Sequence, residues 1–398
     1  MLTISESDIS INRFERRGRK QKLNHLIIYL LFIILFLFLF IYFRIFNLKL
    51  NQNFSLNQLN NIYIINLKDD IFKKVKYLEN MIKRKDILND NSTIYDFDIE
   101  EFDEKFNQKY IESQQHFCTS NNLFLDSEVE KKIIKTKSHL NNIEFEIFVY
   151  KSNDIVSNSI INTGSWEIEE TKNLLNCLDY YSKKKKLFKN KVMFLDIGAN
   201  VGWHSFFLGK AGYEIIAFEA SNVNNYILKK NFCLNNDIKI TIINKGIGLK
   251  NEKCLLDHPL SNIGNGGIIS CLEQRNITKN NKKLIEEVKI TKLSNYINFL
   301  SKKNLGLIKI DIEGAEGKAI ISGIELITKY HVPFLFIEFA PYYMKLQGTD
   351  PKFFLELFLN NGYKISKYDF LSKKYSSIDE LLKIETTNLY FIYSKFLE

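Results

Sequence analysis

Residues 194–219 have the sequence FLDIGANVGWHSFFLGKAGYEIIAFE, and this stretch decides the fold. An apolar run leads into Asp196, a glycine-containing turn follows, and a helical stretch covers residues 203–210. A second apolar run, residues 215–218, ends on Glu219. The order strand, turn, helix, strand predicts one βαβ unit of an open α/β sheet, which binds its ligands at the carboxyl ends of the strands.

The spacing of the turn is D-x-G-x-N-x-G. A dinucleotide site has G-x-G-x-x-G and a P-loop has G-x-x-x-x-G-K-[ST], so neither phosphate-binding pattern is present. An acid after the second strand is placed to bind both hydroxyls of a ribose. A nucleoside with an amino acid and no phosphate suits this pattern, which predicts S-adenosylmethionine as cofactor; a ligand-free turn is the alternative. The predicted cofactor-binding residues are Asp196, Gly198, Asn200, Gly202 and Glu219.

Further apolar runs predict the remaining strands of the same sheet. Because each run is continuously hydrophobic, we expect helices on both faces of the central strands. Seven strands result, which predicts a doubly wound, Rossmann-like α/β sheet with the cofactor at the edge formed by the first two. The predicted strands are residues 192–195, 215–218, 239–243, 307–310, 334–337, 363–368 and 388–393.

Acidic residues follow the fourth and fifth of these strands. Asp311, Glu313 and Glu316 come after the fourth strand, and Glu338 ends the fifth, so four carboxylates should converge at one edge. Asp311 would orient or deprotonate an acceptor hydroxyl. Capping of the next helix by Glu313 or Glu316 is one alternative, and a divalent cation held by two acids is another.

His204 lies at the start of the helix after the glycine turn, where its side chain would face the same cleft. Histidine can act as a base near neutral pH, although a packed neighbour of the cleft is the alternative role. We predict Asp311, Glu313 and His204 as catalytic residues and a site without a metal. The loop SNIGNGG, residues 261–267, would lie on the acceptor side, with a simple turn as the alternative.

Taken together, these motifs resemble the FkbM family of S-adenosylmethionine-dependent methyltransferases. FLDIGANVGWHS, IIAFEA, LGLIKIDIEGAEGKAIISGIELI and FLFIEFA carry the similarity, with the upstream segment DIVSNSIINTGSWEIEET of residues 154–171. The similarity covers residues 146–345. It implies a class I methyltransferase fold and O-methyl transfer, often to a sugar or polyketide hydroxyl. It also implies that Asp311 lies beside the transferred methyl group and that Trp166 and Glu167 fold over the cofactor.

A membrane anchor is predicted near the start of the chain. Residues 26–43 are eighteen consecutive apolar or aromatic residues, enough to cross the hydrocarbon layer. A cleaved signal peptide would be shorter and would end at small residues, which do not follow here. Six basic residues precede the run, which predicts a cytoplasmic N-terminus and a lumenal or extracellular remainder in the secretory pathway, such as the Golgi. The predicted parts are a tail (1–25), a signal anchor (26–43), a helical stem (44–145) and the methyltransferase domain (146–398).

The formal net charge of +9 does not indicate nucleic-acid binding. Six positive charges lie in the tail, the other lysines are scattered, and no zinc-finger, helix-turn-helix or RNA-recognition pattern is present. In a lumen, the triplets at Asn53, Asn91 and Asn276 would be glycosylation acceptors.

Five cysteines without C-x-x-C spacing exclude the usual zinc and thioredoxin motifs. In an oxidising compartment Cys254 and Cys271 are the nearest pair for a disulfide, but we expect buried free thiols.

The sequence therefore predicts a single-pass membrane protein whose lumenal domain methylates a hydroxyl of a glycan. A methyltransferase for a lipid or a small metabolite is one alternative. A catalytically silent, membrane-anchored binding protein that keeps the fold is the other.

Overall fold

The computed structural model describes residues 101–119, 129, 132–259, 261–271 and 283–398. The predicted tail, membrane anchor, most of the stem and all three glycosylation triplets lie outside these residues. Among the described helices, none combines the length and apolar character needed to span a membrane.

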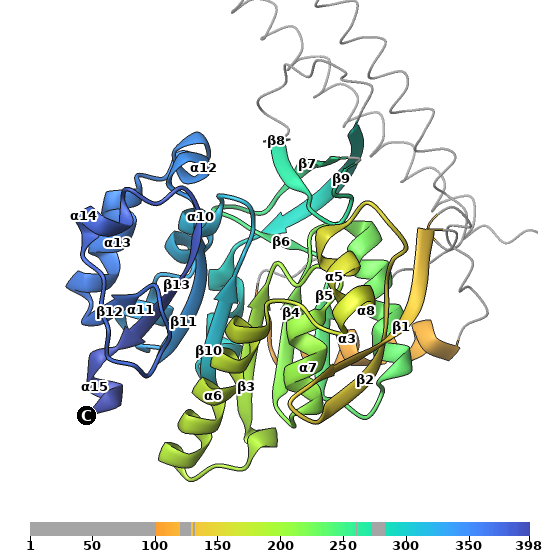
Figure 1. Cartoon of the computed structure of the whole chain (residues 1–398), viewed down its shortest axis with the longest axis horizontal. Helices are drawn as coiled ribbons and strands as arrows, with labels where there is room; N and C mark the ends of the chain where they lie inside the picture. The colour runs from red at the N-terminus through yellow and green to blue at the C-terminus, as the bar shows by residue number, and fades with distance from the viewer. Residues whose placement is uncertain (1–100, 120–128, 130–131, 260, 272–282) are drawn as a thin grey trace, which may run out of the picture. The chain divides into compact units, whose positions relative to one another are not determined.

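A seven-stranded sheet forms the centre of the fold (Figure 1). Its order is β12-β13-β11-β10-β3-β4-β5; β13 is antiparallel to both neighbours and the other paired strands are parallel. The order reverses between β3 and β10, which is the switch point where open sheets bind ligands. The predicted seven-stranded, doubly wound sheet is confirmed. Its strands are β3 (Val192–Ile197), β4 (Glu214–Phe218), β5 (Ile240–Ile243), β10 (Asn304–Ile310), β11 (Phe334–Phe339), β12 (Tyr363–Ser366) and β13 (Thr387–Tyr393).

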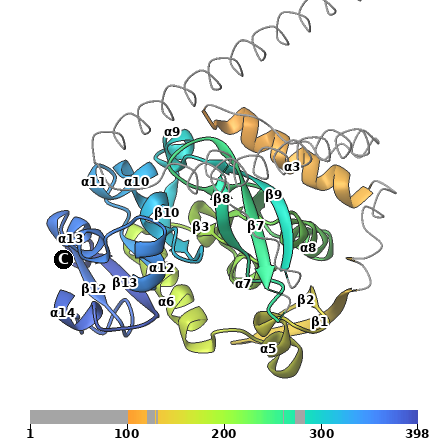
Figure 2. The same ribbon diagram turned by 90° about the horizontal axis from the view of Figure 1, so that it is seen from above.

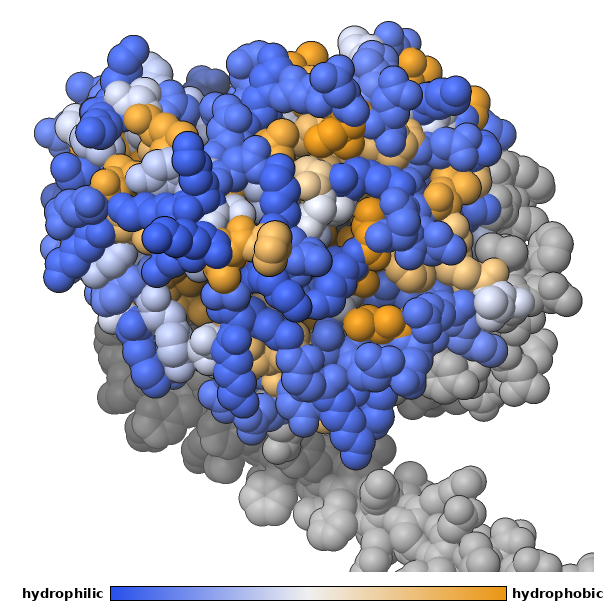
Figure 3. All heavy atoms as spheres, turned by 90° about the horizontal axis from the view of Figure 1, so that it is seen from below, coloured by the Kyte–Doolittle hydropathy of each residue, from blue (hydrophilic) through white to orange (hydrophobic). Residues whose placement is uncertain are grey.

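Helices cover both faces of this sheet and bury two hydrophobic clusters against it. Leu178, Phe206 and Leu228 come from three helices on one face, and Phe299 and Phe354 come from helices on the other. The apolar side chains are packed inside, so the face in Figure 3 is mostly hydrophilic with scattered apolar residues. The helices are α6 (Ile168–Lys185), α7 (Trp203–Lys210) and α8 (Asn222–Leu234) on the first face, and α9 (Ile297–Leu300), α10 (Glu316–Ser322) and α13 (Pro351–Asn360) on the second.

A second, four-stranded sheet is inserted between β5 and β10 and lies at the carboxyl edge of the main sheet (Figure 1). The sequence did not predict it because β7 and β9 mix polar with apolar residues and share only a small core. Residues 261–266 lie in the β7–β8 connection and Gly267 begins β8, so the predicted loop belongs to a hairpin. In the order β6-β9-β7-β8, the strands are β6 (Gly246–Ile247), β9 (Lys283–Thr291), β7 (Glu252–Pro259) and β8 (Gly267–Cys271).

Helix α3 (Glu104–Thr119) covers the edge strand β5 and lies beside α8 (Figure 2). The Gln114 side chain donates to the Ile240 carbonyl at 3.0 Å and accepts from the Ile242 amide at 2.7 Å. It thereby gives hydrogen-bond partners to backbone groups of β5 that no neighbouring strand of the described residues pairs with. Phe102 is fully buried beneath the same region. The predicted domain boundary at residue 146 falls inside β2, and the described residues 101–119 and 132–145 belong to the same compact unit as the rest of the fold. The hairpin strands are β1 (Ile133–Leu140) and β2 (Ile143–Tyr150).

Two disulfides correct the expectation of free thiols. Cys118 is bonded to Cys233 and joins α3 to α8, while Cys254 is bonded to Cys271 across β7 and β8. The antiparallel register places the second pair directly opposite each other. Only Cys177 is free, and it is buried. The remaining elements are α5 (Ile155–Thr163), η1 (Lys189–Lys191), η2 (Leu293–Tyr296), α11 (Glu325–Thr328), α12 (Pro341–Leu346), α14 (Ile378–Leu381) and α15 (Ser394–Leu397).

Candidate active site

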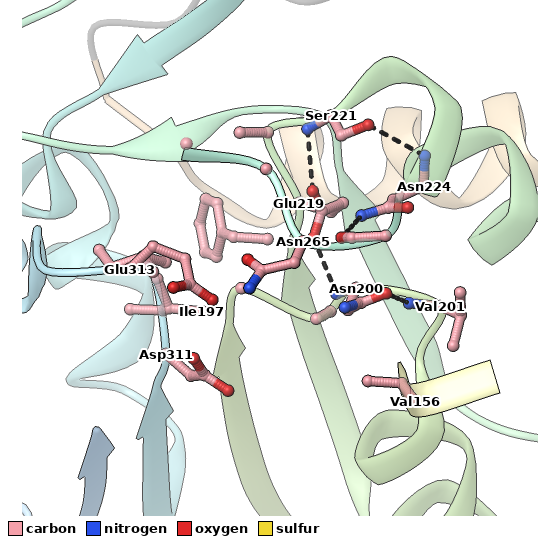
Figure 4. Close-up of a pocket in the computed structure, with 18 of the residues that line it drawn as sticks. Val156, Ile197, Asn200, Val201, Glu219, Ser221, Asn224, Asn265, Asp311 and Glu313 are labelled. Atoms are coloured by element: carbon pink, nitrogen blue, oxygen red, sulfur yellow. Dashed lines mark hydrogen bonds between the residues drawn. The ribbon is translucent and has the colours of Figure 1, made fainter. Parts of the chain in front are cut away.

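A cavity of about 290 Å³ lies at the carboxyl ends of β3, β4, β10 and β11, with the β7–β8 hairpin as one wall (Figure 4). Asp196 and Gly202, two of the eight predicted site residues, lie behind its wall. The other six line the cavity: Gly198, Asn200, His204, Glu219, Asp311 and Glu313.

Glu219 joins the glycine turn to the start of α8. Its carboxylate accepts from the Asn200 amide at 2.7 Å and from the Ser221 amide at 2.8 Å (Figure 4). Burial raises the pKa of Glu219 to about 7. A carboxylate has about four acceptor positions, so Glu219 retains capacity for the hydroxyls of a ribose at this strand end.

Gly198 permits the turn to approach β10. A Cβ atom at this position would lie 1.9 Å from the Asp311 carbonyl oxygen, and φ is +84°. Gly202 has φ +93°, and a Cβ there would meet the side chains of Phe206 and Leu228. The first glycine therefore shapes the cavity, whereas the second lets α7 pack against α8.

Three carboxylates converge on the opposite side of the cavity. Oxygen atoms of Asp311, Glu313 and Glu338 all lie within 4.8 Å of one another. Burial and the Asp311 carboxylate raise the pKa of Glu313 to about 7 and that of Glu338 to about 9. Near neutral pH this group therefore holds protons, and Glu338 can donate a hydrogen bond.

The fourth predicted acid, Glu316, has the capping role. Its carboxylate accepts from the backbone amides of Ile312 and Gly314 at 3.0 and 3.1 Å. These bonds hold the turn after β10, and Glu316 does not line the cavity.

Lys309, which is not among the predicted site residues, is the central cation of the site. Its ammonium lies 3.2 Å from an Asp311 oxygen, 3.3 Å from the Gly198 carbonyl and 3.7 Å from an Asp196 oxygen. The residue is 3% exposed. Asp196 also accepts from the Ser205 hydroxyl at 2.7 Å. Because Asp196 does not line the cavity, it influences the site only by pairing with Lys309. The sequence does contain an indication of this role, because Lys309 is the one charged residue in the otherwise apolar strand LGLIKI.

We expect Lys309→Met to lower the free energy of unfolding by about 3–5 kcal/mol, because the buried carboxylate of Asp196 loses its counter-charge. Denaturant titration measures this change. The exposed Lys302 gives the control variant Lys302→Met, which should unfold like the parent. Equal stability of both variants would show that Lys309 offsets no buried charge.

His204 lies beside Glu167 at the cavity wall. Burial lowers the pKa of His204 well below its ordinary value, so the ring is neutral at pH 7. Its Nε2 is 3.6 Å from a Glu167 oxygen and has no hydrogen-bond partner among the described residues. Burial and Asp311 raise the pKa of Glu167 to about 7. Glu167 and Trp166 line the cavity where the predicted cover would lie.

Polar contacts hold the loop of residues 261–267 against the site. The Gly264 amide donates to Asp154 at 3.1 Å, and Asn224 donates to the Gly264 carbonyl at 3.0 Å. His258 lies 2.7 Å from the Ile263 carbonyl through Nδ1 and 2.7 Å from Glu286 through Nε2. Both partners are acceptors, so the two bonds together require the protonated ring.

Cofactor affinity should fall as the pH rises through the titration of His258. Burial opposes the charge on this ring, but Glu286 raises its pKa above the ordinary value. Below the ordinary pKa of histidine, the protonated His258 ring makes both hydrogen bonds and stabilises the loop. This stabilisation is lost as the pH rises above the raised pKa of His258. Calorimetric titration with S-adenosylhomocysteine from about pH 6 to about pH 9 measures the effect.

The variant His258→Gln should weaken this part of the pH dependence. Glu287→Gln is the control, because it removes an exposed carboxylate from β9, next to Glu286, the partner of His258. A parent and a His258→Gln variant with identical profiles would contradict this role of His258.

Residues 196–365 match the model of the methyltransferase FkbM domain. This match confirms the predicted resemblance to the FkbM family over these residues, and with it the predicted class of enzyme, an S-adenosylmethionine-dependent methyltransferase. A comparison with curated proteins finds no match.

Solved structures of several methyltransferases show a low similarity to the chain. Magnesium protoporphyrin IX methyltransferase from Synechocystis, solved with bound SAM, has 10% identity and a TM-score of 0.29, over 72% of this chain and 97% of that one. A SAM-dependent methyltransferase from Agrobacterium tumefaciens has 11% identity and a TM-score of 0.30, over 65% of this chain and 70% of that one. WbdD has 12% identity and a TM-score of 0.34, over 59% of this chain and 43% of that one. These scores are too low to support an inference about the present site.

Proposed function

We propose that this protein transfers the methyl group of S-adenosylmethionine to a hydroxyl of a glycan, in a membrane-anchored lumenal setting. The observation that carries the proposal is that Glu219 and Asp311, each at the end of a central strand, face one cavity. Its volume of about 290 Å³ and the close approach at Gly198 fit a nucleoside held against the turn.

Different residues of the chain would have different roles in this reaction. When bound, S-adenosylmethionine supplies an electrophilic methyl group. Glu219 would hold the ribose of the cofactor. Asp311, paired with Lys309, would accept the hydroxyl proton as the acceptor oxygen attacks, and alignment would supply much of the rate.

One observation and one prediction from the sequence support the lumenal setting. Both disulfides are of the kind that persists in oxidising compartments, and the predicted anchor precedes the domain. Glycosidase digestion of the cellular protein tests this proposal, because Asn53, Asn91 and Asn276 should carry glycans in a lumen. Three unmodified asparagines in a protein that also lacks both disulfides would contradict it.

Titration of the full chain, kept in a detergent without sugar head groups, with S-adenosylhomocysteine separates the enzyme from a silent binding protein. Failure to bind S-adenosylhomocysteine would contradict the proposal that the protein is a methyltransferase. Mass spectrometry of glycans and lipids from cells with and without the gene then finds the acceptor, as a species that becomes lighter by one methylene. Such a change in lipids alone would favour the lipid alternative.

A further inference from the structure

We propose that α12 carries an aromatic platform, Tyr342 and Tyr343, on which a sugar ring of the acceptor stacks beside the cavity. This inference rests on the proposed function and names the part of the site that selects its acceptor. It makes the two tyrosines specificity residues rather than catalytic ones.

Helix α12 joins two walls of the cavity. It follows directly after β11, whose Glu338 lines the cavity, and Figure 1 shows it at the carboxyl edge of the sheet. A Cβ atom at Gly314 would lie 2.8 Å from the Cβ of Tyr343, so α12 packs on the turn that follows Asp311. Just after the helix, Gln347 donates to the Ile268 carbonyl of the opposite wall at 3.2 Å.

The outer side of α12 is apolar and open. Tyr342 is 67% exposed, Tyr343 is 52% exposed and Leu346 is 66% exposed, while Pro341 and Met344 are buried and anchor the helix. The two tyrosine rings are 5.5 Å apart and meet edge to face. Single exposed apolar residues are ordinary, but three on one six-residue helix beside a cavity indicate a contact surface.

A sugar ring fits this surface better than a lipid chain does. One face of a sugar ring carries mainly C–H groups, which pack on the electron-rich face of a tyrosine, and its hydroxyls point outward from the ring. The neighbouring carboxyl groups of Glu313 and Glu338 offer those hydroxyls both acceptors and a protonated donor. An acyl chain would meet these polar groups without satisfying them, which is costly.

Saturation-transfer NMR on the full chain tests the platform. The probes are methyl glycosides of glucose, galactose, mannose, fucose and N-acetylglucosamine, in a detergent without sugar head groups. At least one probe should receive saturation at its ring protons. Tyr342→Ala and Tyr343→Ala should each weaken its binding about fivefold, because one aromatic contact is worth about 1 kcal/mol.

Matched variants separate stacking from folding. Tyr342→Phe and Tyr343→Phe keep the rings and should keep the signals, and Tyr368→Ala removes a half-exposed tyrosine from the segment after β12 instead of from α12. S-adenosylhomocysteine affinity, measured in parallel, should be the same in all of them. If the parent binds S-adenosylhomocysteine but no glycoside, or if both alanine variants bind the glycoside as the parent does, the platform is refuted. A parent that fails to bind S-adenosylhomocysteine refutes the proposed function itself.

Discussion

Asp311→Asn should reduce methyl transfer by about 10²- to 10⁴-fold, the range expected when a general base is removed. The amide has the same size as the carboxylate but does not take up the hydroxyl proton. Lys309 lies 3.2 Å from the Asp311 carboxylate, which gives Asp311 a counter-charge that Glu313 and Glu338 do not share to the same extent.

The rate is measured as transfer of a labelled methyl group to the acceptor found by mass spectrometry. Titration with S-adenosylhomocysteine on the same preparation should show little change, because the nucleoside is held at the Glu219 side of the cavity. Asp379→Asn, which changes an exposed acid in α14, is the control and should be fully active. Transfer by Asp311→Asn at more than about a tenth of the parent rate would rule out a base at this position.

The second large effect is expected for Glu219→Gln, which should weaken cofactor binding by about 2 kcal/mol, or about thirtyfold. The carboxylate accepts from two backbone amides, whereas a glutamine amide turns a donor toward one of them. The glycine turn would lose one of its fixed contacts and the ribose would lose a charged acceptor.

Calorimetry with S-adenosylhomocysteine measures this loss, and thermal unfolding shows that the variant is folded. Glu214→Gln is the matched control, because Glu214 begins the strand that Glu219 follows but pairs with Lys239 at 2.7 Å, outside the cavity lining. A Glu219→Gln variant that binds as tightly as Glu214→Gln would show that Glu219 does not hold the ligand.

The central sheet was predictable because its strands are buried on both faces and therefore form continuous apolar runs. The small sheet was not, since strands such as β9 are packed on one side only and mix charged with apolar residues. The same limit applies to Cys118 and Cys233, which are 115 residues apart and meet only because α3 folds back on α8.

Within the site, residues adjacent to a strand end were predictable and residues acting from a distance were not. Asp311 and Glu219 follow apolar runs, so their place at the sheet edge follows from chain direction. Asp154 and Asn224 line the cavity and bind the hairpin loop, and His258 contacts the same loop from behind the cavity wall. Local spacing in the sequence does not reveal such contacts. The membrane anchor and the glycosylation triplets remain predictions, because they lie outside the described residues.

The contact between Gln114 and β5 has a practical consequence for producing the enzyme in pieces. A fragment cut at residue 146 would lack α3, so β5 would present unpaired amides and carbonyls to other molecules and would invite intermolecular strand pairing. It would also leave Cys233 without its partner, as a thiol able to crosslink two fragments. Recombinant versions of this enzyme should therefore start upstream of Phe102, or they will aggregate before any assay begins.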